Sequence, residues 1–482
     1  MTIRPWTFRL SLAATVAALC VAVACGGGSG AAPTPSLSPS PTPTQLILTP
    51  GPTESPPQTA YQLLVRSTSA TQDIIWRASP ADLTQRIPVA AIDHREGFPV
   101  KAAISPDGTF LAVLSLPDEA TSADSSQAVA SVIDLKTNET TELTGGVDYQ
   151  YTPLWSPDSA LLYMRRYAGP EFLAANVSVL RVRVVHKPGP DDPTPKPTPT
   201  VPPGIEPWPG VDAVETILQD SVAHVLRFSP IGFAGDGNSM FFLEEEGGTE
   251  GTSVIGIYSP AATAEVDQRN KAAEDAWYAA QQANLQALQA AQANGQPPPA
   301  DTVTPAPTPA PDSRLVVVLS DQSVSGCSLS PDAHSVAYLA PSFTESGDIL
   351  TQTYVANLIE ATAAPLPLRG LSVGDQLDPA WYPDGRLTVG VLPDTGGPGQ
   401  LALLALDLSS ITLLAQPESG FDVPRAWAPD GTWLAVTHMS GTSQANPGDS
   451  RLDIVSVNGH RVTVIDGPDM ASKDAVLGWV KP

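Results

Sequence analysis

A short turn motif recurs six times in this chain and constrains the fold more than any other feature. In the copy at residues 425–436, RAWAPDGTWLAV, an apolar segment ends in an aromatic residue, a Pro-Asp-Gly turn follows, and a second apolar segment begins at once. Proline pre-sets its φ angle, aspartate can hydrogen-bond backbone groups inside the turn, and glycine accepts a positive φ. The motif therefore predicts two antiparallel strands joined by a tight turn.

The copies are spaced along the chain with a period near fifty residues. Their turn aspartates are Asp107, Asp158, Asp236, Asp332, Asp384 and Asp430. Successive aspartates are 51, 78, 96, 52 and 46 residues apart. The two long intervals contain a Pro-rich insertion at 187–210 and an insertion at 264–312, which is Ala/Gln-rich and then Pro-rich. Without these insertions, every interval approaches fifty.

Such a period, with about four short strands in each repeat, predicts a β-propeller. The segments that follow the turns, such as LAVL at 111–114 and MFFL at 240–243, are continuous apolar runs, which is typical of strands buried on both faces. The chain ends in VLGWV at 476–480, the first strand of a further repeat, and residues 61–89 supply the strands that this repeat lacks. We therefore predict an all-β, seven-bladed propeller over residues 61–482, with the N- and C-terminal strands in one blade.

The repeated W-S-P-D-G-x-x-L-A pattern resembles the TolB-like, or WD40-like, β-propeller repeat, and the resemblance covers residues 61–482. It implies the propeller fold. Proteins with this repeat include periplasmic accessory proteins that bind partners, propeller domains attached to peptidases, and lipoproteins of unassigned role. The resemblance therefore does not select a function.

Residues 1–24 have the pattern of an export signal. Arg4 and Arg9 precede an apolar run at 10–24 that is too short for a comfortable membrane span. The run ends in Ala-Val-Ala before Cys25 and resembles the bacterial lipobox, although Ala stands at the third position before the cysteine, where Leu is commonest. The resemblance implies that the Cys25 thiol carries a diacylglycerol lipid with acyl chains such as palmitate, which would hold the protein on the membrane.

Two alternatives to this reading of the N-terminus stay open. An ordinary signal peptide cut near Ala24 would leave Cys25 as a free thiol, and Cys20 is a second, poorer lipobox candidate. With Cys25 lipidated, we expect a membrane-anchored protein of the cell envelope that faces the extracytoplasmic side. Residues 25–60 would be the lipidated cysteine and a disordered tether rich in Pro, Thr and Ser.

The second insertion predicts one α-helix over residues 265–294, because this segment is rich in Ala, Gln and Leu and ends before Gly295 and three prolines. A narrow apolar stripe follows one side of it, formed by Val266, Ala273, Trp277, Ala280 and Leu288. The stripe could dock a partner or a second protomer. Alternatively, the helix is solvated and Trp277 packs against its own propeller.

Catalytic motifs are absent from the sequence: it has no G-x-S-x-G nucleophile elbow, no H-E-x-x-H pair and no phosphate-binding glycine loop. The six histidines are scattered without metal-ligand spacing, and the turn aspartates are explained by their turns. We therefore predict no enzyme activity, no cofactor and no metal at these positions. The net charge of −25 argues against nucleic acid as a partner, which leaves an envelope or extracellular protein, or a glycan.

Carboxylates recur in or beside the segments that join one predicted blade to the next. They are Glu96, Asp148, Asp220, Asp321, Asp375, Asp378, Asp422 and Asp474. In a propeller these segments surround the mouth of the central channel, so the carboxylates would form an acidic ring that a metal ion such as Ca²⁺ or a basic peptide could neutralise. The alternative is that an acidic protein carries acid in most of its loops.

Two classes of function follow. The first is a membrane-anchored lipoprotein whose propeller is a non-catalytic scaffold that binds a protein or another ligand. The second is an enzyme that acts on an extracellular glycan or another polymer through carboxylates at the channel mouth. Two inward carboxyl groups about 5 to 9.5 Å apart in a cleft would favour the enzyme.

Overall fold

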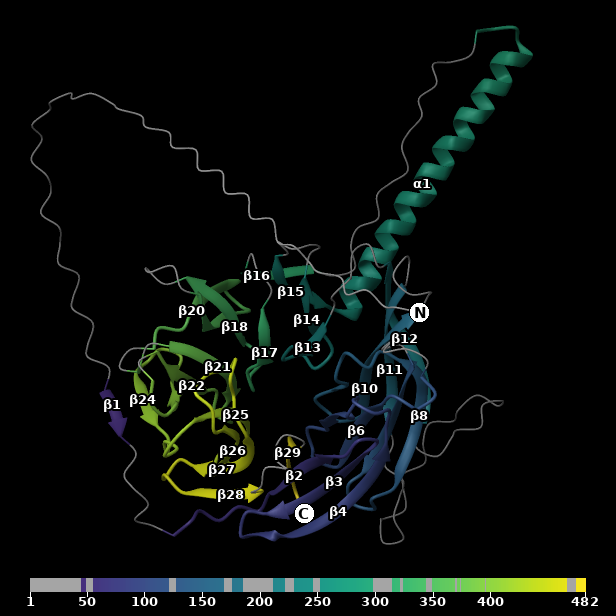
Figure 1. Ribbon diagram of the computed structural model, residues 1–482. Helices are drawn as coiled ribbons and strands as arrows, with labels where there is room; N and C mark the ends of the chain where they lie inside the picture. The colour runs from purple at the N-terminus through teal and green to yellow at the C-terminus, as the bar shows by residue number, and fades with distance from the viewer. Residues whose placement is uncertain are drawn as a thin grey trace, which may run out of the picture. The chain divides into compact units, whose positions relative to one another are not determined.

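The computed structural model describes residues 45–48, 55–120, 127–168, 176–184, 211–221, 229–245, 252–297, 314–320, 324–343, 349–368, 371–372, 374–394, 396–465 and 474–482. All of them belong to one compact unit, Thr44–Pro482 (Figure 1). The predicted signal peptide, Cys25 and the first part of the tether lie outside the described residues, as do the Pro-rich runs of both insertions.

One sheet contains both ends of the propeller chain. Its order is β29 (Asp474–Val480), β2 (Gln62–Thr68), β3 (Gln72–Ser79) and β4 (Asp82–Asp93). β29 runs antiparallel to β2, with Trp479 opposite Leu63. The predicted sharing of one sheet by the first and last strands is confirmed.

The next sheet has eight strands, where two separate blades were predicted. It comprises β5 (Lys101–Ile104), β6 (Phe110–Ser115), β7 (Ala128–Asp134), β8 (Thr140–Val147), β9 (Leu154–Trp155), β10 (Leu161–Ala168), β11 (Asn176–Val184) and β12 (Val211–Ser221). Its two four-stranded halves are joined where Val147 of β8 pairs with Arg166 of β10.

Four further sheets contain the predicted four strands, and the third of them has a fifth strand that is described below. The first is β13 (Ser229–Phe233), β14 (Met240–Glu245), β15 (Ser253–Tyr258) and β16 (Arg314–Ser320). The second is β17 (Ser325–Leu329), β18 (Ser335–Phe343), β19 (Ile349–Asn357) and β20 (Thr362–Pro365). The third is β21 (Gly374–Trp381), β22 (Leu387–Pro393), β23 (Gln400–Leu404) and β24 (Ser410–Leu413). The fourth is β25 (Phe421–Trp427), β26 (Trp433–Met439), β27 (Ser450–Ser456) and β28 (Arg461–Ile465).

The described strands therefore form six sheets, and the predicted count of seven blades is corrected to six. The pairing of β8 with β10 is the physical reason, because it merges two predicted blades into one hydrogen-bonded sheet. The first strands of successive repeats contact one another in a closed series: β29 contacts β5, then β9, β13, β17, β21 and β25 follow in turn, and β25 contacts β29. This closed series gives the propeller-like arrangement.

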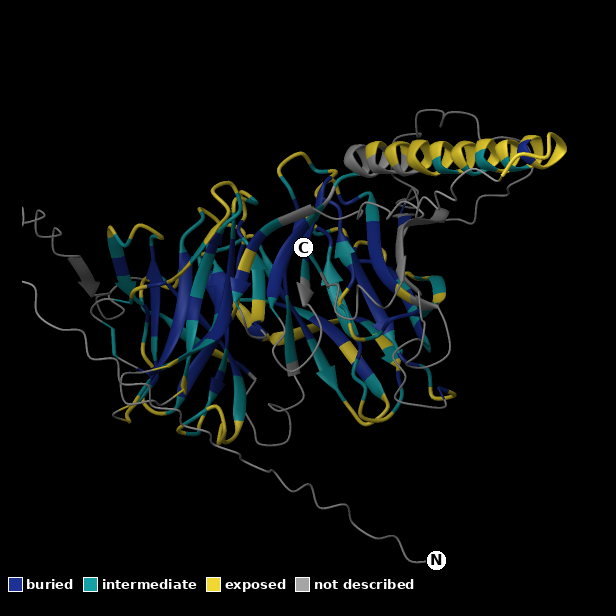
Figure 2. Cartoon of the chain, turned by 90° about the horizontal axis from the view of Figure 1, so that it is seen from above, coloured by how far each residue is buried: buried dark blue, intermediate teal, exposed yellow. Residues whose placement is uncertain are grey.

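Apolar side chains fill the spaces between neighbouring sheets, so that buried residues lie along the central strands and exposed ones in the turns (Figure 2). One cluster joins Leu63 and Trp479 of the shared sheet to Trp433 and Ile454 of the sheet before it. Burying one such side chain contributes about 1.5–3 kcal/mol. The continuous apolar runs are explained by this packing, since strands such as β6 are buried on both faces.

The predicted helix is confirmed as α1 (Pro260–Ala293), between β15 and β16 in the chain. It begins five residues earlier than predicted, because proline is well accommodated in a first helical turn. Gly295 follows its end with a φ of +62°. Ala273 and Ala280 of the predicted stripe are exposed, whereas Trp277 and Leu288 are half-buried. The Trp277 ring packs edge-on against Tyr278, with the centroids 4.9 Å apart.

A short strand lies within the segment predicted to be a disordered tether. β1 (Gln45–Leu48) pairs in parallel with β24, so these four residues extend a sheet. Farther along, the Trp433 Nε1–H donates to the Pro57 carbonyl at 3.2 Å, and the Thr59 hydroxyl donates to Asp430 at 2.6 Å. Within the described part of the chain, no helix has both the length and the apolar character that crossing a bilayer requires.

Candidate functional site

The six turn aspartates share one local geometry. Each carboxylate accepts a hydrogen bond from the backbone N–H two residues later, at distances between 2.9 and 3.1 Å. The residue after each aspartate has a positive φ, and this residue is Ser159 in one turn and Ala333 in another. The carboxylates thus hold the turns closed, which is a structural use of the side chain.

Hydrogen bonding also sets the acidity of these groups. The pKa of Asp236 and that of Asp332 lie below the ordinary aspartate value, chiefly because the hydroxyls of Ser239 and Ser330 donate to them. At Asp107, burial raises the pKa, but hydrogen bonds from Ser105 and Thr109 outweigh burial and leave the pKa lowered. Each of these carboxylates is therefore stabilised in its charged form.

The predicted acidic ring contains eight residues, and the structure describes the side chains of five. Glu96, Asp148, Asp375, Asp378 and Asp422 are described, whereas the side chains of Asp220, Asp321 and Asp474 lie outside the described part. Asp148 and Asp422 are buried, Asp375 and Asp378 are half-buried, and Glu96 is exposed. The five therefore differ widely in their access to solvent.

Asp148 is engaged in a buried ion pair. Its side chain is 1% exposed and lies 3.4 Å from Nε of Arg165, whose side chain is 2% exposed. The other carboxylate oxygen accepts from the Gln150 N–H at 3.0 Å, and the Arg165 guanidinium also lies over the Tyr151 ring, 4.2 Å from its centroid. This arrangement compensates the Asp148 charge without an added cation.

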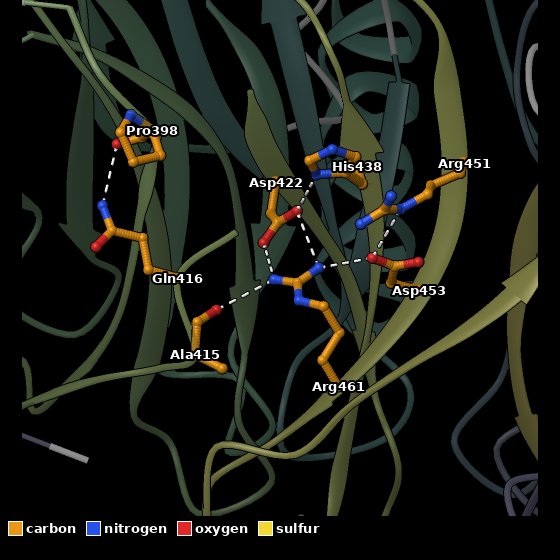
Figure 3. A network of polar contacts seen from close by, with 8 residues as sticks. All are labelled: Pro398, Ala415, Gln416, Asp422, His438, Arg451, Asp453 and Arg461. Carbon is orange, nitrogen blue, oxygen red and sulfur yellow. Dashed lines mark hydrogen bonds and ion pairs between the residues drawn. The ribbon is translucent and has the colours of Figure 1, made fainter. Parts of the chain in front are cut away.

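Asp422 belongs to a network of buried charges (Figure 3). His438 Nδ1 lies 2.9 Å from Asp422 Oδ1, and Arg461 forms an ion pair with the same carboxylate. Arg461 also pairs with Asp453 at 2.7 Å and donates to the Ala415 carbonyl at 3.1 Å. Arg461 therefore joins the connection after β24 to the sheet of β25–β28.

The network contains two carboxylates and two arginines. Arg451 Nε lies 3.2 Å from Asp453 Oδ2, and both carboxylate side chains are fully buried. Burial of the Arg461 guanidinium lowers its pKa, but the hydrogen bonds that it donates to Asp422 and Asp453, together with their negative charges, outweigh burial and raise the pKa above its ordinary value. Each of the two carboxylates is therefore paired with arginine inside the protein.

Asp375 and Asp378 lie on β21 and are also engaged. Asp375 Oδ1 accepts from the Thr351 N–H of the preceding sheet at 2.9 Å. Asp378 lies 3.4 Å from Nη1 of Arg425 on β25, in a pair that is open to solvent. Burial lowers the pKa of Arg425, and the charge of Asp378 partly offsets this effect.

A further buried cluster, centred on Asp73, was missed by the sequence analysis. Asp73 is fully buried, accepts from the Val100 N–H at 2.7 Å, and pairs with Arg66 at 3.5 Å and with His94 Nε2 at 3.1 Å. His94 Nδ1 lies 2.8 Å from the Arg95 carbonyl. Asp73 and the Arg95 carbonyl therefore hold the imidazole ring at both of its nitrogens.

A sequence signal does exist for two of these clusters. The basic partner of Asp148 is Arg165, 17 residues later, and the basic partner of Asp422 is His438, 16 residues later. This spacing places each basic residue on the next strand of the hairpin. Asp422 and His438 are direct cross-strand neighbours. An acidic residue at the start of the first strand of a repeat, followed at this spacing by a basic residue, therefore predicts a buried ion pair. An acidic residue considered by itself does not.

The chemistry available at the ring follows from these contacts. Among the residues that the structure describes, no three His, Cys, Asp or Glu side chains gather in a way that could hold a metal ion. The ring hypothesis assumed uncompensated carboxylates, but Asp148, Asp378 and Asp422 each have an arginine partner. These three residues act between strands and sheets, where they fix neighbouring elements.

Comparisons with known proteins assign this chain to no family. No protein-family model matches the sequence, and no curated protein matches it. Similar solved structures include TolB from Acinetobacter baumannii, with 14% identity and a TM-score of 0.37 over 73% of this chain and 62% of that one. The chain thus spans less than two thirds of the length of that TolB. The described sheets make the present chain an all-β propeller with one inserted helix.

Other similar solved structures are enzymes or parts of enzymes. The β-propeller domain of the Trilobed protease from Pyrococcus furiosus has 9% identity and a TM-score of 0.44, over 85% of this chain and 96% of that one. Oligogalacturonate lyase in complex with manganese has 12% identity and a TM-score of 0.44, over 83% of each chain. The set includes both TolB and enzymes, and at these identities and TM-scores it selects no function.

Proposed function

We propose that this chain is a lipid-anchored scaffold of the cell envelope, on the extracytoplasmic side, that binds a protein or glycan partner without converting it chemically. The observation that carries the non-catalytic part is the engagement of Asp148 and Asp422 in buried ion pairs. A general acid or base must come within hydrogen-bonding distance of a substrate proton. Carboxylates that are buried in the protein and ion-paired with arginine do not meet that condition.

The enzyme alternative requires two open carboxyl groups about 5 to 9.5 Å apart. Asp422 and Asp453 both contact Arg461 and are near each other, yet each side chain is fully buried. Among the described residues, no observation favours polymer cleavage, and the binding scaffold remains the better supported function.

A turnover assay tests the non-catalytic part. The purified mature chain would be incubated with a panel of neutral and acidic glycans and with a peptide mixture, and the solutions would be analysed for new reducing ends and new peptide termini. We expect none above a heat-denatured control. New products formed in proportion to protein concentration would contradict the proposal.

The anchor is proposed from the lipobox-like sequence before Cys25. Mass spectrometry of the N-terminal peptide should find a diacylglycerol on Cys25, and the protein should sediment with membranes in high salt. The variant Cys25→Ala should move to the soluble fraction with its propeller folded. A Cys25→Ala protein that stays on the membrane, or an unmodified Cys25 in the mature chain, would contradict the anchor.

A further inference from the structure

A pocket of about 200 Å³ opens at the edge of β19, beside the connection from β20 to β21. Leu350, Thr351 and Gln352 of β19 form one wall. Leu368, Leu371 and Ser372 of the connection, with Gly374 and Gln376 of β21, form the other. The pocket therefore lies between two neighbouring sheets, apart from the buried charge network of Figure 3.

Two hydrogen bonds between the sheets fix the pocket walls. The Thr351 N–H donates to Asp375 at 2.9 Å, and the Thr353 N–H donates to Gln376 Oε1 at 2.8 Å. In an extended strand, the N–H and C=O of one residue point to the same edge, so both bonds close the edge of β19 that β20 leaves unpaired. The β19 and β21 parts of the walls are thus held by the protein before any ligand arrives.

Position 374, in the pocket wall, accommodates glycine but no residue with a side chain. A Cβ at this position would lie 1.8 Å from the Leu392 carbonyl oxygen, so a side chain would collide with the backbone of β22. Glycine therefore lets β21 run close to β22 at this point of the pocket wall.

The polar groups of the pocket are neutral and still have bonding capacity. Across the described ranges, no protein partner is found for the side chains of Ser342, Gln352 and Ser372, all of which line the pocket, and Gln376 binds Thr353 through its oxygen alone. Beside them, the Thr353 hydroxyl is buried with no hydrogen-bond partner. An unpaired buried hydroxyl such as that of Thr353 is costly, and the half-exposed hydroxyls and amide beside it can bond a ligand that supplies donors and acceptors.

The character of these groups indicates the class of ligand. Hydroxyls and side-chain amides both donate and accept, as sugar hydroxyls do, while Leu350, Leu368 and Leu371 offer apolar contact to the C–H face of a ring. None of the described residues that line the pocket is charged, and a protein of net charge −25 repels polyanions. The volume equals about seven waters at ~30 Å³ each, below the ~300 Å³ of pockets for drug-sized ligands.

From these features we infer that the pocket binds one residue of a neutral sugar, as a free saccharide or as part of a glycan. The inference rests on the proposed binding function and gives it a ligand class and a place. A ligand of about a dozen heavy atoms in a shallow site binds with a dissociation constant on the order of 1 mM, and a longer neutral glycan gains avidity only if several copies bind it.

The test uses the mature chain and defined sugars. Saturation-transfer NMR would be recorded with methyl glycosides of glucose, galactose, mannose and N-acetylglucosamine, and affinity electrophoresis with neutral and acidic polysaccharides. Gln352→Leu and Ser372→Ala remove hydrogen-bonding groups that carry no bond inside the described protein. Gln286→Leu, on an exposed position of α1, is the matched control, and thermal unfolding shows whether each variant remains folded.

We expect binding of at least one neutral sugar, with affinity reduced tenfold or more by Gln352→Leu and by Ser372→Ala, and unchanged by Gln286→Leu. Equal binding by the folded pocket variants would overturn the pocket assignment. Binding of none of the neutral sugars, or a preference for the acidic polysaccharide, would overturn the ligand class while leaving the binding scaffold intact. Cleavage of a bound sugar would instead contradict the non-catalytic function and leave the pocket standing.

Discussion

At the scale of single residues, ionised carboxylates in this protein act mainly as structural groups. The turn aspartates hold their own backbone, and the buried aspartates hold a neighbouring strand or sheet through arginine or histidine. The identity of the turn residues could be predicted from the sequence, because the turn chemistry is local. The buried pairs could not, since their partners depend on which strands pair and which faces are buried.

The lowered pKa of Asp236 predicts a pH-dependent contribution to stability. A carboxylate whose folded pKa lies below its unfolded pKa of ~3.9 stabilises the fold fully above that value and loses the contribution as pH falls through the folded pKa. Asp236→Asn should therefore cost about 1 kcal/mol at pH 7 and less at pH 3, measured by urea unfolding at both values. The exposed Glu360→Gln should change neither, and an identical cost of Asp236→Asn at both pH values would contradict the prediction.

Arg461 should contribute more than Arg451 to the free energy of unfolding. Arg461→Met leaves Asp422 and Asp453 buried with less compensation, and the loss of one partner of a buried pair costs about 3–5 kcal/mol. Arg451→Met should cost about 1 kcal/mol or less, because its side chain is 36% exposed and Asp453 keeps Arg461. Urea midpoints of the two variants measure the difference, and equal midpoints would show that Arg461 does not carry the network.

At the scale of elements, hairpin strands and the helix were predictable, because their apolar runs and turn signals are local in the sequence. The merging of two predicted blades was not, since it depends on the pairing of Val147 with Arg166 across the connection after β8. Likewise, the sequence QLIL of β1 does not indicate which sheet edge the strand joins. Composition predicted a disordered tether around β1, whereas the strand itself depends on its pairing with β24.

Trp479 should be among the most sensitive positions in the closing sheet. Its side chain is 6% exposed, packs in the cluster between two sheets and donates to the Ala426 carbonyl at 3.0 Å. Trp479→Ala should cost about 3–5 kcal/mol. Trp277→Ala, the same substitution on α1, should lie within about 0.5 kcal/mol of the wild type in urea unfolding. A large effect of Trp277→Ala would mean that α1 contributes to the propeller core.

Removal of α1 should leave the propeller intact. Ile257 of β15 is paired with Arg314 of β16, so a short Gly-Ser loop can replace residues 260–312 without moving either strand. The expected result is a thermal midpoint within about 2–4 °C of the full-length protein, by circular dichroism. A collapse of the transition would show that the insertion supports the sheet of β13–β16.

At the scale of the whole molecule, the propeller class was predictable from the fifty-residue period, and the sharing of one sheet by both ends followed from the terminal half-repeat. The candidate site was predicted only as a list of carboxylates, because net charge counts acids but not their partners. The neutral pocket gave no sequence signal: its residues come from β18, β19, the connection after β20, and β21, and only the packing of two sheets brings them together.

The pairing of β29 with β2 also has a consequence for the timing of folding. A ribosome that adds about 5–20 residues per second needs roughly 20 to 80 s to translate the roughly 400 residues between Thr68 of β2 and Asp474 of β29. Until β29 emerges, the nascent β2 has an unsatisfied edge that could join a strand of another molecule. Newly made copies should therefore depend on holdase chaperones until the last strand is synthesised.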